Sequence, residues 1–215
     1  MRILGIDEAG RGPVIGPLVI AGAMIEEGEM DILRELGVRD SKELSRERRE
    51  EIFEELMKME VRTTYHIIPP AIIDYYVEKG KLNYLEIKYS CKIIEELRPD
   101  RAVIDSFIRN SEKLKKMIYD RLSYKPELIV EIKADKKYPI VSAASIVAKV
   151  IRDREIEKIK EEVGVDFGSG YPSDERTIES LKDHYDILKD YVRKTWFTVR
   201  KIRDKRQKNI KDFFK

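Results

Sequence analysis

Apolar positions along the chain follow two periods, and together they predict a mixed α/β protein. Short apolar runs bounded by turn residues predict strands at 3–7, 18–25, 61–68, 102–105 and 128–132. Apolar residues at helical spacing predict helices at 29–36, from Ser45 as N-cap to about 59, and at 72–79, 82–97 and 111–122. A further helix is predicted from 139 onward, and more helix after the loop at 168–174. A short glycine-rich turn between the first two strands predicts an antiparallel hairpin, and helices between the later strands predict parallel crossovers.

The longest predicted helix begins at Pro139, a residue that fits the first turn of a helix. One face of it carries Ile140, Ala143, Ala144, Val147, Val150 and Ile151. A face of this kind packs against a sheet. The sequence therefore predicts a mixed sheet covered by helices.

Acidic residues fall where three of the predicted strands end. Asp7 and Glu8 end the first strand, Asp105 ends the fourth, and Asp135 follows the fifth within three residues. Ligands of open α/β sheets bind beyond the strand ends, so these acids would meet there if the first strand is central and lies beside the fourth. The alternative is that they are ordinary solvated strand ends or helix caps, which position alone leaves open for Asp105 and Asp135.

Converging carboxylates would need a counter-charge, because each close pair repels by roughly 4 kcal/mol at an effective dielectric constant near 20. Oxygen ligands without His or Cys favour Mg²⁺ or Mn²⁺ over zinc. Two such ions roughly 3.5–4 Å apart form the clamp used for phosphodiester hydrolysis. Gly10, Arg11 and Gly12 follow the first acids directly, and glycines let a ligand approach the backbone closely. We therefore expect a phosphate or sugar binder beside a divalent-metal site.

Charge is distributed unevenly along the chain. The net charge of +2 does not by itself indicate a nucleic-acid binder, but residues 193–215 carry ten Lys and Arg against two Asp and Glu.

The single cysteine, Cys91, excludes a disulfide framework within the chain and a cysteine-rich zinc site. Apolar runs are too short to span a bilayer and the N-terminus has no signal-peptide pattern, so we expect a soluble, cytoplasmic, monomeric protein.

Several longer motifs resemble one family of proteins. They are I-D-E-A-G-R-G-P at 6–13, D-S-K at 40–42, V-I-D-S at 103–106, K-A-D-K-K-Y-P at 133–139, S-A-A-S-I-V-A-K at 142–149 and G-S-G-Y-P-S-D at 168–174. In this order they resemble ribonuclease HII, particularly its archaeal members, from residue 2 to about residue 203. One departure is Ile132, where many members of the family carry a histidine.

The resemblance implies a ribonuclease H-like fold, with a mixed five-stranded sheet flanked by helices and a C-terminal helical subdomain. The expected division is a catalytic domain at 1–165, a helical substrate-binding part at 166–203 and a tail at 204–215. The implied activity is cleavage of RNA in RNA–DNA hybrids, and 5′ to single ribonucleotides in duplex DNA, with two Mg²⁺ or Mn²⁺ ions. The family's metal ligands correspond to Asp7, Glu8, Asp105 and Asp135.

Residues that would bind the substrate follow from the same resemblance. The backbone of Gly10, Arg11 and Gly12, together with the side chain of Tyr171, is expected to contact the ribose 2′-hydroxyl, the group that separates RNA from DNA. Phosphate contacts are expected from Ser41 and Lys42. Lys149 and Arg152, one helical turn apart, would either face phosphate or lie on a solvated helix face.

The last residues form a second motif. Gln207, Ile210, Phe213 and Phe214 have the spacing Q-x-x-I-x-x-F-F, which resembles the peptide that replication proteins use to bind the sliding clamp PCNA. The alternative is that these apolar residues pack on the chain's own body.

Two further functions are kept open for the whole chain: a resolvase-like nuclease of the same fold, and a non-catalytic adaptor that binds nucleic acid and the clamp.

Overall fold

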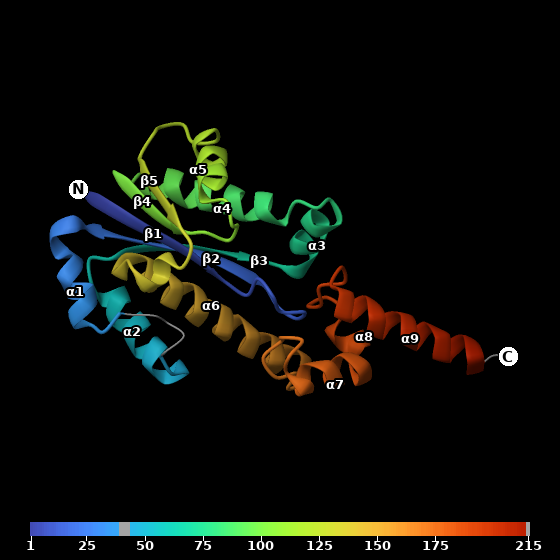
Figure 1. Ribbon diagram of the computed structural model, residues 1–215. Helices are drawn as coiled ribbons and strands as arrows, with labels where there is room; N and C mark the ends of the chain where they lie inside the picture. The colour runs from blue at the N-terminus through green and yellow to red at the C-terminus, as the bar shows by residue number, and fades with distance from the viewer. Residues whose placement is uncertain (39–43, 214–215) are drawn as a thin grey trace. The chain divides into compact units, whose positions relative to one another are not determined.

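Five strands form one mixed sheet in the order β3-β2-β1-β4-β5 in the computed structural model, which describes residues 1–38 and 44–213 and side chains as far as residue 205 (Figure 1). The strands are β1 (Arg2–Ala9), β2 (Leu18–Glu26), β3 (Arg62–Ile68), β4 (Arg101–Asp105) and β5 (Glu127–Glu131). β1 pairs antiparallel with β2 and parallel with β4, and β4 pairs parallel with β5. The predicted hairpin is confirmed. β1 is central and lies beside β4, which is the condition under which the acids were expected to meet.

The helices agree with the predicted ones to within a few residues at their ends. They are α1 (Met30–Glu35), α2 (Arg46–Lys58), α3 (Pro70–Glu78), α4 (Leu82–Leu97), α5 (Ser111–Tyr119), α6 (Pro139–Val163), α7 (Glu175–Asp183), α8 (Tyr185–Leu188) and α9 (Phe197–Phe213). Ser45 caps α2, as its hydroxyl accepts a hydrogen bond from the Arg48 N–H at 3.2 Å. None of the helices in the described part of the chain combines the length and apolar character needed to cross a bilayer.

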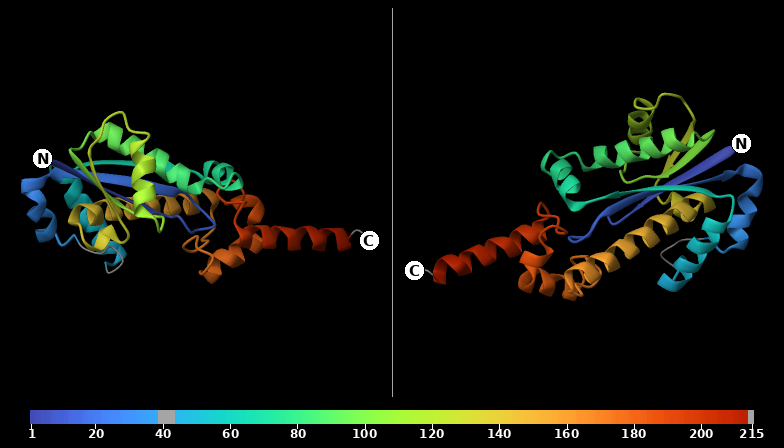
Figure 2. Two further views of the ribbon diagram at one scale, coloured as in Figure 1. Left: turned by 45° about the horizontal axis from the view of Figure 1, so that its top comes forward. Right: turned by 180° about the vertical axis from the view of Figure 1, so that it is seen from behind.

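Helices cover both faces of the sheet (Figures 1 and 2). On one face, Ala21 and Ala23 of β2 share a buried apolar cluster with Phe53 of α2 and Val147 of α6. On the other face, Ile93 of α4 lies so close to β2 that a Cβ atom at Gly22 would be 2.5 Å from its side chain. Because both faces are covered, charged groups of the central strands are accommodated at the strand ends.

The start of α6 lies directly on the central strand. A Cβ atom added at Gly5 of β1 would be 2.3 Å from the carbonyl oxygen of Ile140 and 2.6 Å from the nitrogen of Val141. Both of these are backbone atoms, which cannot move aside as a flexible side chain does. The missing side chain of Gly5 therefore sets how closely α6 approaches the strand that carries Asp7.

Contacts divide the chain into two compact units that do not follow the order of the sequence. Unit 1 comprises residues 1–9, 19–67 and 83–151, and unit 2 comprises 10–18, 68–82 and 152–215. In unit 2 the turn after β1 is joined to the C-terminal helices by an antiparallel bridge between Ile15 and Val192 and by a shared apolar core with Phe167. The division at 165 and 203 expected from the sequence stays a prediction.

We expect the substitution Gly5→Ala to lower the free energy of unfolding by about 1–3 kcal/mol or more, because the added methyl group meets backbone rather than a yielding side chain. Chemical denaturation of the purified variant measures this. Gly28→Ala is the matched control, since a Cβ atom there meets nothing within 4 Å. Equal stability of the two variants would contradict the close approach of α6.

Candidate active site

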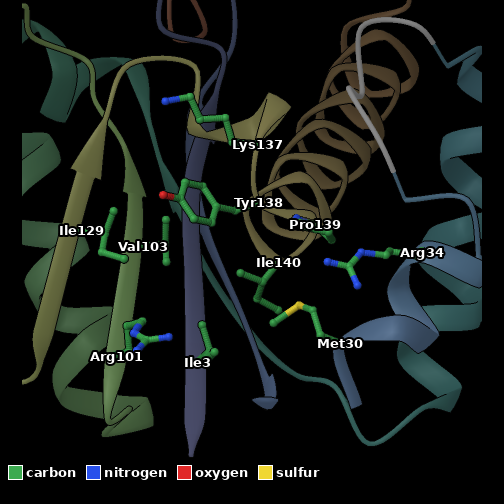
Figure 3. A pocket seen from close by; sticks show the side chains of 10 residues that line it. All are labelled: Ile3, Met30, Arg34, Arg101, Val103, Ile129, Lys137, Tyr138, Pro139 and Ile140. Atoms are coloured by element: carbon green, nitrogen blue, oxygen red, sulfur yellow. The ribbon is translucent and has the colours of Figure 1, made fainter. Parts of the chain in front are cut away.

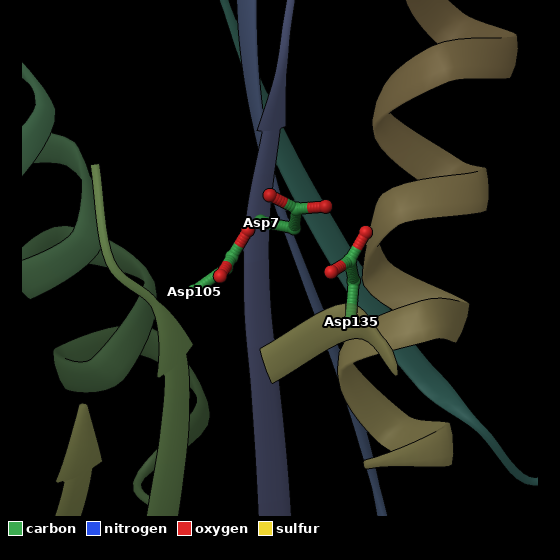
Figure 4. Close-up of side chains that lie close together, drawn as sticks. All are labelled: Asp7, Asp105 and Asp135. Atoms are coloured by element: carbon green, nitrogen blue, oxygen red, sulfur yellow. The ribbon is translucent and has the colours of Figure 1, made fainter. Parts of the chain in front are cut away.

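Three carboxylates converge at the C-terminal parts of β1 and β4 and in the turn that follows β5 (Figure 4). One oxygen from each of Asp7, Asp105 and Asp135 lies within 4.8 Å of the other two. Asp7 is 7% exposed and Asp135 is 3% exposed, while Asp105 is half-buried. The parallel pairing of β1 with β4 explains the first two, because the paired residues Ile6 and Ile104 immediately precede them.

Glu8, the fourth predicted acid, lies outside this group of three carboxylates. Successive side chains of a strand point to opposite faces, so Glu8 and Asp7 leave β1 in different directions. The Glu8 backbone nevertheless contributes, as its N–H donates a hydrogen bond of 2.8 Å to Oδ1 of Asp7. A role of the Glu8 side chain in metal binding stays a prediction.

The turn after β5 brings Asp135 to the other two acids. Lys133 has a backbone φ of 60°, a left-handed conformation that reverses the chain sharply. The N–H of Ala134 then donates to Oδ1 of Asp105 at 2.9 Å, and the hydroxyl of Ser142 donates to the carbonyl oxygen of Asp135. The turn is thus held to β4 on one side and to α6 on the other.

Burial raises the pKa of Asp7 to about 7, and the neighbouring charge of Asp105 acts in the same direction. A hydrogen bond from Ser145, the N–H of Glu8 and the positive charge of Lys149 lower it. The ammonium of Lys149 donates to Oγ of Ser145 at 3.2 Å, so these two residues of α6 form a polar chain that ends on Asp7. Ser145 was not predicted: it lies one helical turn before Lys149, and the sequence does not indicate that its hydroxyl reaches Asp7.

This donor set suits a hard divalent cation. Carboxylate oxygens are the ligands that Mg²⁺ and Mn²⁺ prefer. The three carboxylates repel one another, and a bound cation would offset this repulsion. The residues present therefore fit the divalent-metal site expected from the sequence.

The glycine turn and Tyr171 lie together in unit 2. Gly10 has a φ of +85°, and a Cβ atom there would be 2.6 Å from the carbonyl oxygen of Pro17. Gly12 is exposed, and a Cβ atom added to it would be 3.7 Å from Cε1 of the Tyr171 ring. The turn is hydrogen-bonded to the tyrosine loop, because the carbonyl of Gly170 accepts from the N–H groups of Val14 (2.8 Å) and Ile15 (3.2 Å).

Arg152 supports the tyrosine loop. Its guanidinium carbon lies 5.0 Å from the centre of the Tyr171 ring, and its Nη2 donates to the carbonyl of Ser169 at 2.5 Å. The side chain is only 6% exposed. This excludes the solvated helix face that was one of the two expectations for Arg152, and leaves the phosphate contact as a prediction.

Other predicted residues lie outside what the structure describes. They are Ser41, Lys42 and Phe214, and the side chains of Gln207, Ile210 and Phe213, whose backbone belongs to α9.

A separate pocket of about 310 Å³ lies in unit 1, between Ile3 of β1, Met30 of α1 and the start of α6 (Figure 3). Strand residues such as Ile3 and Val103 line it, and none of its ten described lining residues carries a carboxylate. Arg101 at its edge is in an ion pair with Glu127 at 2.7 Å, and Lys137 is paired with Glu131. This pocket is therefore not part of the acidic centre.

Comparison with known proteins gives one consistent result. The family model described as Ribonuclease HII matches residues 4–199. A protein from Pyrococcus abyssi named ribonuclease HII is 48% identical over 95% of this chain and 92% of its own length. The solved structure of ribonuclease H2 from Pyrococcus horikoshii is 43% identical with a TM-score of 0.87, covering 95% of this chain and 98% of that one. A structure described as the PCNA:RNase HII complex from Archaeoglobus fulgidus is 43% identical with a TM-score of 0.84, covering 91% of this chain and 95% of that one.

The raised pKa of Asp7 predicts how the stability of the metal-free protein depends on pH. Its pKa of about 7 in the folded protein exceeds the ordinary 3.8, so between these values the folded protein holds a proton that the unfolded chain lacks. Stability therefore falls as the pH rises from about 4 to 7. Asp7→Asn removes this loss, and we expect it to stabilise the metal-free protein at pH 8 by on the order of 1–4 kcal/mol.

Denaturant unfolding in the presence of a chelator, measured at pH 5 and at pH 8, tests this expectation. Asp120→Asn, an exposed acid at the end of α5, is the matched control and should change stability little at either pH. If the Asp7→Asn variant is no more stable than the parent at pH 8, burial of the Asp7 carboxylate does not destabilise the metal-free protein.

Proposed function

The chain belongs to the ribonuclease HII family, and we propose that it cleaves the RNA strand of RNA–DNA hybrids and cuts 5′ to single ribonucleotides embedded in duplex DNA, leaving 3′-hydroxyl and 5′-phosphate ends. The observation that carries this proposal is the convergence of Asp7, Asp105 and Asp135. Hydrolysis of this kind would serve the excision of ribonucleotides and the removal of RNA primers.

The three converging carboxylates would hold two Mg²⁺ or Mn²⁺ ions, with Glu8 as a fourth ligand. The chemistry that such ions supply when bound is activation of a water molecule and stabilisation of the leaving 3′-oxygen. The protein's own contribution is to fix the carboxylates in advance: Ala134 binds Asp105, Ser142 binds the backbone of Asp135, and the Lys149–Ser145 chain ends on Asp7. Carboxylates held in this way need little reorganisation when the ions and the scissile phosphate bind.

Selectivity for RNA would come from the glycine turn and Tyr171. Backbone groups of Gly10, Arg11 and Gly12 would contact the ribose 2′-hydroxyl, and the exposed Gly12 beside the tyrosine ring leaves room for a sugar. Arg152 would act through Tyr171, because its guanidinium lies over the ring and its hydrogen bond to Ser169 fixes the loop.

Contacts to the phosphate backbone would position the duplex without reading its sequence. We propose Ser41, Lys42 and Lys149 for this role, with Arg152 as a further phosphate contact. The half-buried Lys149 would then have two functions, as its ammonium is also hydrogen-bonded to Ser145.

A sliding clamp is the proposed protein partner, and the enzyme itself would act as a monomer. The relative from Archaeoglobus fulgidus whose solved structure is described as a PCNA:RNase HII complex supports this partner. Gln207, Ile210, Phe213 and Phe214 would make the contact, with the apolar side chains in a pocket of the clamp and the glutamine bonded outside it.

We expect Asp7→Asn and Asp105→Asn each to lower cleavage of a duplex with one ribonucleotide by more than about 10³-fold, because each removes a charge needed to hold the ions. Duplex affinity should stay within a few-fold of the parent. Gel analysis of products with Mg²⁺ and with Mn²⁺ measures cleavage, and Asp120→Asn is again the control.

Two outcomes would contradict the proposal. Cleavage within tenfold of the parent in both variants would mean that the acids do not perform the chemistry, as in a non-catalytic adaptor contaminated by another nuclease. Equal cutting of the corresponding all-DNA duplex by the parent protein would identify a nuclease without ribose selectivity, such as a resolvase-like enzyme.

The tail predicts a second, separable effect. We expect the double substitution of Phe213→Ala and Phe214→Ala to weaken binding to an archaeal sliding clamp by about 100-fold or more, since buried aromatic anchors contribute about 2 kcal/mol or more each. Cleavage without the clamp should be unchanged. Calorimetric titration of the clamp measures the affinity, with Lys201→Ala, an exposed residue of α9, as control. Unchanged affinity would favour packing of the tail on the chain itself.

A further inference from the structure

Arg193 lies on the segment between α8 and α9, and its side chain is fully buried, with 0% exposed. Its guanidinium points into the turn formed by residues 10–16 of the same unit. Nε donates to the carbonyl of Gly16 at 3.1 Å, Nη1 to that of Arg11 at 2.9 Å and Nη2 to that of Gly10 at 2.5 Å. The three donors of one rigid, planar group thus bind three carbonyls of one turn.

The backbone around Arg193 is fixed as well. Its own N–H donates to the carbonyl of Val14 at 2.9 Å. The carboxylate of Asp74 accepts hydrogen bonds from the N–H groups of Lys194 at 2.8 Å and Thr195 at 3.0 Å. The guanidinium is therefore presented to the turn from a backbone that is itself held in place.

This arrangement orients the peptide groups of the turn. In a trans peptide the N–H points away from the carbonyl oxygen of the same unit. Because Arg193 holds the carbonyls of Gly10 and Arg11, the N–H groups of Arg11 and Gly12 are directed away from the guanidinium. These are backbone donors of the turn proposed above to contact the ribose.

Burying this cation is unfavourable, which argues that its geometry is needed. The acceptors of its three described hydrogen bonds are neutral carbonyls, and the carboxylate of Asp74, which favours the charge, contributes less than burial opposes it. Burial lowers the pKa of Arg193 to about 9, and the positive charge of Arg152 contributes to this shift. The side chain nevertheless stays protonated near neutral pH, so all of its donors are retained.

We propose that Arg193 is a positioning residue for ribose recognition, which sets the backbone of residues 10–12 so that the N–H groups of Arg11 and Gly12 can meet the 2′-hydroxyl. This rests on the proposed function of the turn. Arg193 does not touch the substrate in this proposal. The tyrosine loop has a contact of its own, the hydrogen bond from Arg152 to the carbonyl of Ser169, so it should survive the loss of the guanidinium.

The test compares Arg193→Lys and Arg193→Ala with the same substitutions at Arg200, an exposed arginine of α9. For each protein, affinity is measured without divalent metal for a duplex with one ribonucleotide and for the matching all-DNA duplex. Cleavage gives kcat and KM, and circular dichroism with thermal unfolding shows that each variant is folded at the assay temperature.

We expect Arg193→Lys to bind the two duplexes equally and to lose at least about tenfold in kcat/KM, because one ammonium cannot hold three carbonyls in the geometry of a guanidinium fork. Affinity for the all-DNA duplex should change less than about threefold. A general loss of structure would instead weaken binding of both duplexes. In Arg193→Ala, low millimolar guanidinium chloride should restore part of the ribonucleotide preference, while the same concentration of sodium chloride should not.

The outcomes separate this proposal from the one on which it rests. A parent protein that binds both duplexes equally would refute ribose recognition by the turn. A parent that prefers the ribonucleotide, with that preference intact in folded Arg193→Lys, would overturn the role of Arg193 alone. Failure of both Arg193 variants to fold would make Arg193 a folding residue and would equally overturn the positioning role.

Discussion

Repulsion among three carboxylates is the constraint on which this structure depends. Asp7, Asp105 and Asp135 are held with oxygens within 4.8 Å of one another, an arrangement that no interaction within the group itself favours. The free energy that keeps them there comes from elsewhere: parallel pairing of β1 with β4, apolar packing on both faces of the sheet, and close approach of α6 to Gly5. These contacts of the fold, and not the carboxylates themselves, thus hold the site in a geometry suited to bind cations.

In unit 2, the main structural feature is a turn whose backbone conformation is fixed by its neighbours. A ribose hydroxyl can be recognised by peptide groups only if these face it, and glycine residues by themselves are the least able to hold one conformation. Here residues outside the turn impose its conformation. The carbonyl of Gly170 accepts hydrogen bonds from two N–H groups of the turn, and the guanidinium of Arg193 donates hydrogen bonds to three carbonyls of the turn. Glycines provide access, and the buried arginine provides the order that they lack.

Much of this architecture could be predicted from the sequence, because it follows from local patterns. Apolar periodicity predicted the strands and most helix ends, Ser45 was predicted to cap α2, and acids at strand ends predicted the convergence of Asp7 with Asp105. The rule that side chains alternate along a strand would also have separated Glu8 from Asp7. The role of Arg193 could not be predicted in this way, since Gly16 lies 177 residues away along the chain and the acceptors are carbonyls that every residue has. Ser145 was missed for a related reason: the sequence does not show that a serine hydroxyl of α6 reaches a carboxylate of β1, 138 residues earlier in the chain.

Ile132 limits which side chains near the acidic centre are able to bind a metal or transfer a proton. It follows β5 directly, it is exposed rather than part of the core, and it stands where many ribonucleases HII carry a histidine. An aliphatic side chain can neither bind a metal nor transfer a proton, and packing does not account for an exposed isoleucine there. In the proposed reaction, proton transfer to the leaving oxygen would then involve groups other than residue 132, and solvent water could serve. If the proposed function holds, the histidine of other family members would assist a reaction that the carboxylates and their ions would perform here without it.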